Sequence, residues 1–191
     1  MLFIIPIVII AYANIKMRLS ILTLALLSST VLADGASILA AMSKVANATV
    51  ALNETVTNFP SGLAGLADVL PLLVGSITLL SDINQGISVA QASANLTLTE
   101  TVEVASATTS LVSGVQSTLL NIENSKPKFD ALLLVSPVLL LNLKLEKEAT
   151  DKFSAAIISK LPAAFASLAE SLTAPIDTAF DAAIADYEGA V

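Results

Sequence analysis

From position 35 onward, apolar residues recur at alternating spacings of three and four, a pattern that predicts α-helices. The first predicted helix runs from about Gly35 to Asn58, and the segment from Pro60 to Gly62 ends it. Its inward face consists of Ile38, Met42, Val45, Thr49, Leu52, Val56 and Phe59. No part of the sequence keeps the period-two alternation of a β-strand, so we expect an all-α protein.

The second predicted helix, from about Leu63 to Ala94, is more apolar and less regular. The spacing predicts an inward face made of Leu63, Leu66, Leu70, Leu73, Ile77 and Leu80. Pro71 predicts a kink or a break into two shorter helices. The stretch Leu63–Leu80 also has nearly the length of a membrane span. Asp68, Pro71 and Gly75 interrupt it, which favours a buried helix of a bundle over a transmembrane helix.

The third predicted helix has a distinct start, because Thr97-Leu-Thr-Glu100 is a capping box. In this motif the threonine hydroxyl accepts the amide of the glutamate, whose side chain reaches back. The predicted inward face is Val104, Thr108, Leu111, Val115, Leu119 and Ile122. We expect the helix to end at Asn124–Pro127. Pro127 and Pro162 are expected in the first turns of the next two helices, where a missing N–H costs nothing.

The fourth helix is predicted to bury Val138, Leu141, Leu145, Ala149 and Ala156, after a break or kink at Ser136-Pro137. Its solvated face is predicted to carry Lys144, Glu146, Lys147, Glu148, Asp151 and Lys152, with Glu148 and Lys152 paired one turn apart. The last helix, bent at Pro175, is predicted to bury Phe165, Leu168, Leu172, Ile176, Ala179 or Phe180, Ala183 and Tyr187. Five or six helices joined by short turns indicate a single antiparallel bundle.

The N-terminal region contains two apolar runs, Leu2–Ala13 and Leu19–Leu32. Lys16 and Arg18 precede the second run, and the small-residue segment ending at Ala33 is typical of a signal-peptidase site. Each run is shorter than the roughly 20 residues of a membrane span, so a signal peptide is favoured over a membrane anchor. We therefore expect a signal region at 1–33, with Met17 as an alternative start, and one domain at 34–191.

Composition narrows the classes of function. Residues 34–191 carry seven basic and 16 acidic side chains, a net charge of −9, which disfavours nucleic acid and anionic membranes as partners. The sequence has no Cys, His or Trp, and therefore no disulfide and no His–Cys metal site. It also lacks a phosphate-binding glycine loop and a G-x-S-x-G motif, so we expect no cofactor and no enzyme activity. Paired carboxylates or a Ser–Lys pair are the remaining catalytic alternatives.

Three sequons, at Asn47, Asn53 and Asn95, are candidate N-glycosylation sites in a secreted chain. The wide apolar stripes, together with Pro71, Pro137 and Pro175, are compatible with splayed helices around a cavity. A closed, kinked core fits them equally well. If a cavity exists, we expect it to bind an apolar ligand and to be lined by Leu70, Leu73, Ile77, Leu111, Val115, Val138, Leu141, Leu145, Leu172 and Ile176.

Several short segments occur in the order seen in a known family. They are Asp34-Gly-Ala, Leu63-Ala-Gly-Leu66, Val69-Leu-Pro-Leu72, Lys126-Pro-Lys-Phe129, Leu161-Pro162 and the segment from Pro175 to Tyr187. On these residues the chain resembles the fungal hydrophobic surface-binding protein A family, which includes the antigenic cell wall galactomannoproteins. The resemblance extends over nearly all of residues 34–191.

This resemblance implies an all-helical, secreted or cell-wall-associated domain without catalytic residues. Some members of the family bind fatty acids in a long apolar cavity, and another adsorbs to hydrophobic surfaces and recruits a polyester-degrading enzyme. The leading hypothesis is therefore a secreted carrier that binds fatty-acid-like lipids between its helices. The alternative is an extracellular or cell-wall interaction protein that coats hydrophobic surfaces and recruits hydrolases. The sequence leaves the oligomeric state open.

Overall fold

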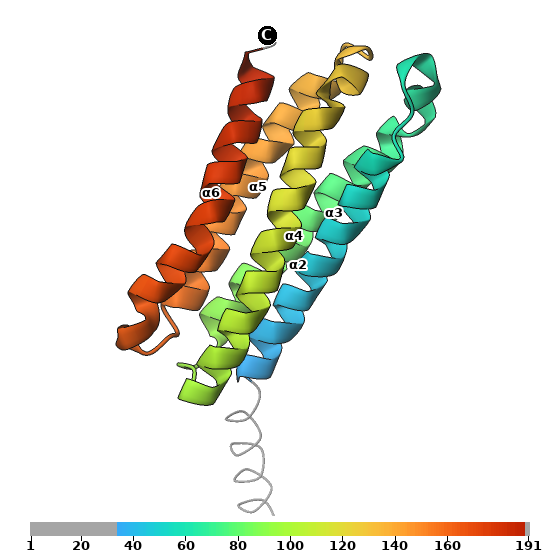
Figure 1. The fold of residues 1–191 in the computed structure, drawn as a ribbon. Helices are drawn as coiled ribbons and strands as arrows, with labels where there is room; N and C mark the ends of the chain where they lie inside the picture. The colour runs from blue at the N-terminus through green and yellow to red at the C-terminus, as the bar shows by residue number, and fades with distance from the viewer. Residues whose placement is uncertain (1–33, 190–191) are drawn as a thin grey trace, which may run out of the picture. The chain divides into compact units, whose positions relative to one another are not determined.

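The computed structural model describes residues 34–189, and this part of the chain is an all-α bundle, as predicted (Figure 1). Its helices are α2 (Asp34–Thr57), α3 (Val69–Ala92), α4 (Leu98–Asp130), α5 (Val135–Ile158) and α6 (Ala166–Glu188), with two short 3-10 helices, η1 (Gly62–Ala67) and η2 (Ala163–Phe165). No strand occurs in this region. The predicted signal region, 1–33, lies outside the described residues.

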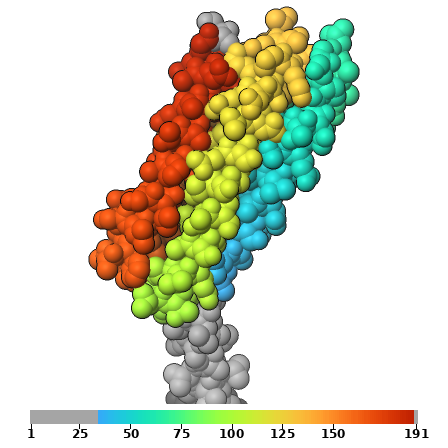
Figure 2. Space-filling model, in the orientation of Figure 1, coloured from blue at the N-terminus to red at the C-terminus, as the bar shows by residue number. Residues whose placement is uncertain are grey.

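The helices form two layers. Figure 2 shows α2, α4 and α6 side by side on one face, and α3 and α5 lie behind them (Figure 1). Among α3 to α6, the closest helix pairs are α3 with α5, α4 with α6 and α5 with α6. Because consecutive helices are antiparallel, the helices of one layer run in one direction and those of the other layer run in the opposite one. The starts of α3 and α5 and the end of α6 therefore share one end of the bundle.

The predicted inward face of α2 is confirmed, since all seven of its residues are buried. The capping box of α4 is also confirmed: the Glu100 amide donates to Thr97 Oγ1 at 3.3 Å, and the Thr97 amide donates to Glu100 Oε2 at 2.8 Å. The other carboxylate oxygen of Glu100 accepts the Gly35 amide at 3.1 Å. The hydrogen bonds from Thr97, and to a smaller extent the one from Gly35, lower the pKa of Glu100. The bond from Gly35 also holds the start of α2 against the start of α4.

The predicted inward face of α3 is wrong. The helix buries the positions Leu72, Ser76, Leu79, Ile83, Gly86 and Ala90, whereas Leu70 and Ile77 are exposed. Residues 69–80 are apolar on nearly every side, so their spacing fits more than one face. Small side chains decide the outcome, because they let α3 approach α5 closely. A Cβ on Gly86 would lie 2.9 Å from the Phe153 ring.

The predicted face of α5 is wrong in its first half for the same reason. Val138, Leu141 and Leu145 point outward, and Leu139, Leu143 and Glu146 are buried instead. Glu146 was expected on the solvated face, yet only 3% of it is exposed. The rest of the predicted charged face is at least partly exposed, and the Lys152 ammonium lies 2.6 Å from the Glu148 carboxylate.

Two prolines that were expected to kink helices do not. Pro71 and Pro137 each occupy the first turn of their helix, α3 and α5, where the backbone N–H has no intrahelical partner to lose. The expected break at Pro71 is present upstream, between η1 and α3 at Asp68. Among the prolines of residues 34–189, only Pro175 of α6 lies in the middle of a helix, where its missing N–H and its ring weaken the local hydrogen bonding.

The other two prolines also depart from their predicted positions. Pro127 lies within the last turn of α4 and does not begin the next helix, although a proline there removes one helical hydrogen bond. Pro162 precedes η2, so α6 begins at Ala166, four residues later than expected. The chain turns between α4 and α5 through Leu133, which has a positive φ of 51°.

By length and composition alone, α2 and α3 are apolar enough to cross a membrane. In the bundle both behave as packed helices, and α3 buries Ser76 against α5. The most apolar window of α3 is only 28% buried, however, so much of its apolar surface faces outward. This exposed surface is distinct from the core.

The close approach of α3 and α5 at Gly86 is testable by substitution. We expect Gly86→Ala to destabilise the protein by about 1 kcal/mol, because the crowding against Phe153 outweighs the gain in helix propensity. Gly114→Ala in α4 is the matched control, since nothing lies within 4 Å of its Cβ position. It should raise stability by up to about 1 kcal/mol. Urea unfolding measures both, and equal stability of the two variants would contradict the packing described.

Candidate functional site

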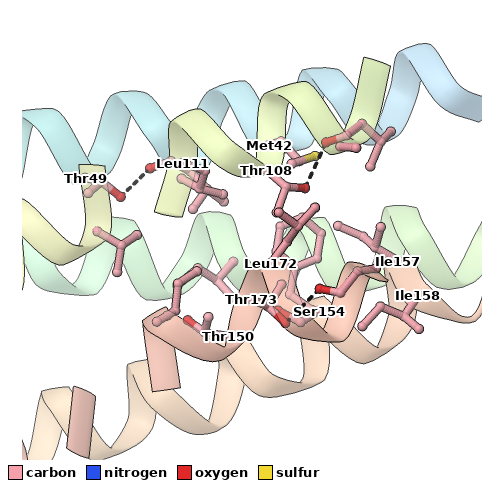
Figure 3. A pocket seen from close by; sticks show the side chains of 18 of the residues that line it. Met42, Thr49, Thr108, Leu111, Thr150, Ser154, Ile157, Ile158, Leu172 and Thr173 are labelled. Carbon is pink, nitrogen blue, oxygen red and sulfur yellow. Dashed lines mark hydrogen bonds between the residues drawn. The ribbon is translucent and has the colours of Figure 1, made fainter. Parts of the chain in front are cut away.

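A long apolar cavity lies between the helices of residues 34–189. All five α-helices contribute to its walls, and its largest contributions come from α4, α5 and α6. Figure 3 shows Leu111 of α4 and Leu172 of α6 directed into this space, with Ile157 and Ile158 of α5 beside them. An apolar space of this kind binds water poorly and apolar ligands well.

The cavity is elongated along the bundle. Its lining on α4 extends from Thr101 to Ile122, which corresponds to about 30 Å of helix. About 90 Å³ of its interior is open to the centre of a water-sized sphere. An extended hydrocarbon chain is long and thin. It therefore fits a long, narrow cavity better than a compact ligand does.

One end of the cavity is closed and the other is more open. At the closed end, the lining residues Leu52, Ile122, Ile176 and Phe180 are all buried. At the opposite end, Phe165 is half-buried and Leu168 is 56% exposed. The first ten residues of α6, before Ile176, include no fully buried side chain. This half of α6 therefore covers the cavity without packing tightly onto the core, and α6 diverges from α4 toward this end (Figure 1).

Four of the ten predicted lining residues border the cavity: Leu111, Val115, Leu172 and Ile176. The other six do not: Leu73 is half-buried elsewhere, and Leu70, Ile77, Val138, Leu141 and Leu145 are exposed. The division follows the helices. The stripes of α4 and α6 were assigned to the correct face, while those of α3 and the first half of α5 were not.

Sequence reasoning did not identify the residues of α5 that line the cavity, nor which hydroxyl groups belong to its wall. Five threonine hydroxyls in the lining donate to carbonyl oxygens three or four residues earlier in their own helices: Thr49, Thr101, Thr108, Thr118 and Thr173. These hydroxyls are thereby satisfied without a ligand. The threonines present mostly their methyl groups to the cavity, which keeps the wall apolar.

Two further hydroxyls in the wall, those of Thr150 and Ser154, have no hydrogen-bond partner among the described residues. The two residues are one turn apart on α5 and so share a face. Every fully buried side-chain oxygen in the described region has a partner, so these hydroxyls are open to the cavity or to solvent. They are the polar groups of the wall best placed to receive a ligand.

Glu146, two turns before Ser154, is the acidic side chain of the described cavity wall. Its Oε1 accepts a hydrogen bond from the Ser76 hydroxyl of α3 at 2.6 Å. Burial raises the pKa of Glu146 to about 7, and the bond from Ser76 offsets only part of that effect. Once it is known which face of α5 is buried, an acidic residue on that face is a clear signal of a functional site.

The described residues contain no group of three or more acidic side chains arranged to hold a metal ion. Among the sequons, Asn47 and Asn95 are exposed. The side-chain oxygen of Asn53 accepts a hydrogen bond from the Asn121 side chain of α4 at 3.0 Å. Nothing in this arrangement points to chemistry, and the site is best described as an apolar container with a short polar strip on α5.

A family comparison and solved structures agree with this description. The sequence model of the family "hydrophobic surface binding protein A" matches residues 35–159, and comparison with curated proteins finds no match. The crystal structure of AfMp4p in complex with palmitic acid is similar, with a TM-score of 0.76 and 27% identity. That match covers 81% of this chain and 99% of AfMp4p.

Two domains of the Mp1 protein of Penicillium marneffei share the fold. Ligand binding domain 1, complexed with arachidonic acids, has a TM-score of 0.70 and 16% identity, covering 77% of this chain and 93% of that one. Ligand binding domain 2, complexed with multiple arachidonic acids, has a TM-score of 0.73 and 18% identity, covering 81% and 96%. At these identities the likeness establishes the architecture.

The buried Glu146 makes stability depend on pH in a predictable direction. Its pKa is about 7 in the folded protein and near 4.5 when exposed, so the folded state binds the proton more tightly. Its stabilising contribution is fully present below about pH 4.5 and is lost as the pH rises through about 7.

We expect Glu146→Gln to gain stability relative to the unmodified protein across this range, by on the order of 3 kcal/mol above pH 7. Urea unfolding at several pH values measures the difference. Glu148→Gln, an exposed position on the same helix, should show little dependence on pH. A stability difference for Glu146→Gln that stays constant with pH would contradict the burial of an ionisable carboxyl.

Proposed function

Since the chain belongs to the hydrophobic surface binding protein A family, we propose that it is a non-enzymatic carrier that binds long-chain fatty acids between its helices. The observation that carries this proposal is the continuous apolar cavity with one closed and one open end. The fatty acids bound by AfMp4p and by the Mp1 domains support the same ligand class.

The ligand carboxylate is proposed to lie against Thr150 and Ser154. A carboxylate needs hydrogen-bond donors when it leaves water, and these two hydroxyls are open and have no protein partner in the described region. The hydrocarbon chain then fills the apolar space between α4, α5 and α6. Ligand binding would also cover the half-exposed apolar side chains of the first half of α6.

We further propose that the protein is secreted and acts outside the cell or at the cell wall. The signal-like features of residues 16–33 support this placement. The exposed sequons at Asn47 and Asn95 support the proposal that the secreted protein is glycosylated. Because the described residues of the cavity wall include no hydroxyl bonded to a basic side chain and no group of three metal ligands, we propose no catalytic step.

The carrier proposal is tested by titrating delipidated protein with palmitic acid. We expect saturable binding near one ligand per protein, weakened at least about tenfold by Leu111→Trp, since the indole fills the space of the chain. Leu141→Trp is the matched control because Leu141 is exposed and outside the cavity. The methyl ester should bind more weakly than the acid. Absence of saturable binding, or equal loss in both variants, would refute a cavity-bound ligand.

A second function is favoured by a different observation: several of the exposed apolar side chains lie on two neighbouring parallel helices, α3 and α5. Leu70, Val74 and Ile77 of α3, and Leu141 and Leu145 of α5, lie outward in the first halves of their helices. No charged residue occurs between Asp68 and Asp82 or between Asp130 and Lys144. We propose that this α3–α5 surface adsorbs to hydrophobic solids such as waxes and polyesters. Hydrolases bound to the adsorbed protein would then lie at the surface of the solid.

Adsorption is tested on alkyl-coated beads. The triple variant Leu70→Glu, Ile77→Glu and Leu141→Glu should adsorb several-fold less, because the charges must be desolvated at the solid surface. Thr109→Glu, Ser113→Glu and Gln116→Glu, all exposed on α4, form the matched control and should adsorb normally. Palmitic acid binding should persist in both triple variants. Unchanged adsorption of the first triple variant would exclude the α3–α5 surface as the site of contact.

A further inference from the structure

Glu146 is a costly residue for an apolar container, because a buried carboxyl destabilises the fold unless its hydrogen bonds are satisfied. The structure satisfies only one of its oxygens, Oε1, through Ser76. No described residue bonds Oε2. Since every fully buried side-chain oxygen in the described region has a partner, Oε2 retains some accessible surface, and the spaces that Glu146 lines are the main cavity and a smaller one beside it. Its environment on α2 and α4 is apolar, formed by Leu52 and Ile122.

A second, smaller space lies beside Glu146. It shares Leu52, Ile122 and Glu146 with the main cavity and is also lined by Ser76 and Asn142, which are polar. About 10 Å³ of it is open to the centre of a water-sized sphere, roughly the room that one water molecule needs. The rest of its lining, Leu72, Leu139 and Leu143, is apolar. The closed end of the apolar cavity therefore borders a small chamber of the size of a hydroxyl group, in which Glu146, Ser76 and Asn142 are the polar residues.

We propose that this closed end recognises a hydroxyl group carried on the ligand's hydrocarbon chain, with Glu146 as the specificity-determining residue. The hydroxyl would donate to Oε2 of Glu146 and occupy the chamber beside Ser76 and Asn142. The ligand class is then hydroxylated long-chain fatty acids, bound in preference to their unsubstituted counterparts. This inference rests on the proposed binding of fatty acids in the main cavity.

The spacing along α5 defines where the hydroxyl lies on the ligand. Ser154, proposed to hold the carboxylate, is two turns from Glu146, so the two polar points are about 12 Å apart along the helix. A chain that extends from Ser154 reaches Glu146 at the closed end before a long acyl chain ends, so the remainder of a longer chain must turn back there. A mid-chain hydroxyl fits this distance, and a terminal hydroxyl fits a chain that folds back into the chamber.

The test compares two pairs of ligands by calorimetry on the delipidated protein: mid-chain hydroxystearic acid against stearic acid, and terminally hydroxylated palmitic acid against palmitic acid. We expect at least one hydroxylated acid to bind about tenfold more tightly than its counterpart, the equivalent of one net hydrogen bond. In Glu146→Leu this ratio should fall to about one, whatever the absolute affinities become. Leucine has a similar volume and should fold, since removing a buried charge for an apolar group is commonly tolerated.

Two further variants separate recognition from a structural role. Glu146→Gln keeps an oxygen that accepts a hydrogen bond and should retain most of the preference. Glu148→Leu places the same substitution at an exposed position and should retain all of it. Equal affinities within both pairs in the unmodified protein, or a preference that survives in Glu146→Leu, would overturn the inference while leaving fatty acid binding intact. If neither stearic nor palmitic acid binds, the proposed carrier function fails first.

Discussion

The two halves of α6 are held differently, and this difference creates the cavity. After Pro175, α6 buries Ile176, Phe180, Ala183 and Tyr187, and the Tyr187 hydroxyl donates to the Ile122 carbonyl at 2.9 Å. Before Pro175 it buries nothing fully. Because proline removes one helical hydrogen bond and its ring crowds the preceding turn, the first half can diverge from the axis of the second. The bundle is therefore packed at one end and hollow toward the other.

The packed end is reinforced by contacts that leave the hollow end free. The rings of Phe59 and Phe129 meet edge to face with centroids 4.9 Å apart, and the Lys128 ammonium donates to the Phe59 carbonyl at 3.0 Å. At the hollow end, the capping box of α4 fixes only the start of α2 through Gly35. A ligand that enters beneath the first half of α6 would thus displace little existing packing, while the rest of the bundle remains a rigid support.

The polar groups of the cavity wall are distributed according to what the helices can satisfy. Threonines whose hydroxyls bond to their own helix present methyl groups, so they add no polarity to the cavity. The polar strip on α5, formed by Glu146, Thr150 and Ser154, follows a spacing of one helical turn and faces the cavity throughout. One wall thus holds the polar groups that we propose orient an amphipathic ligand, and the remaining walls supply apolar surface.

Spacing and capping motifs are enough to predict the all-α class, the capping box at Thr97 and the inward faces of α2, α4 and α6, because in these helices polar residues mark the outer side. Where residues 69–80 and 131–143 are apolar nearly all round, periodicity cannot select a face. Only the tertiary structure decided these registers, through the close approach of Gly86 to Phe153 and the pairing of Ser76 with Glu146. The tertiary structure also reveals the cavity. A cavity depends on the distance between whole helices, and no local sequence pattern encodes that distance.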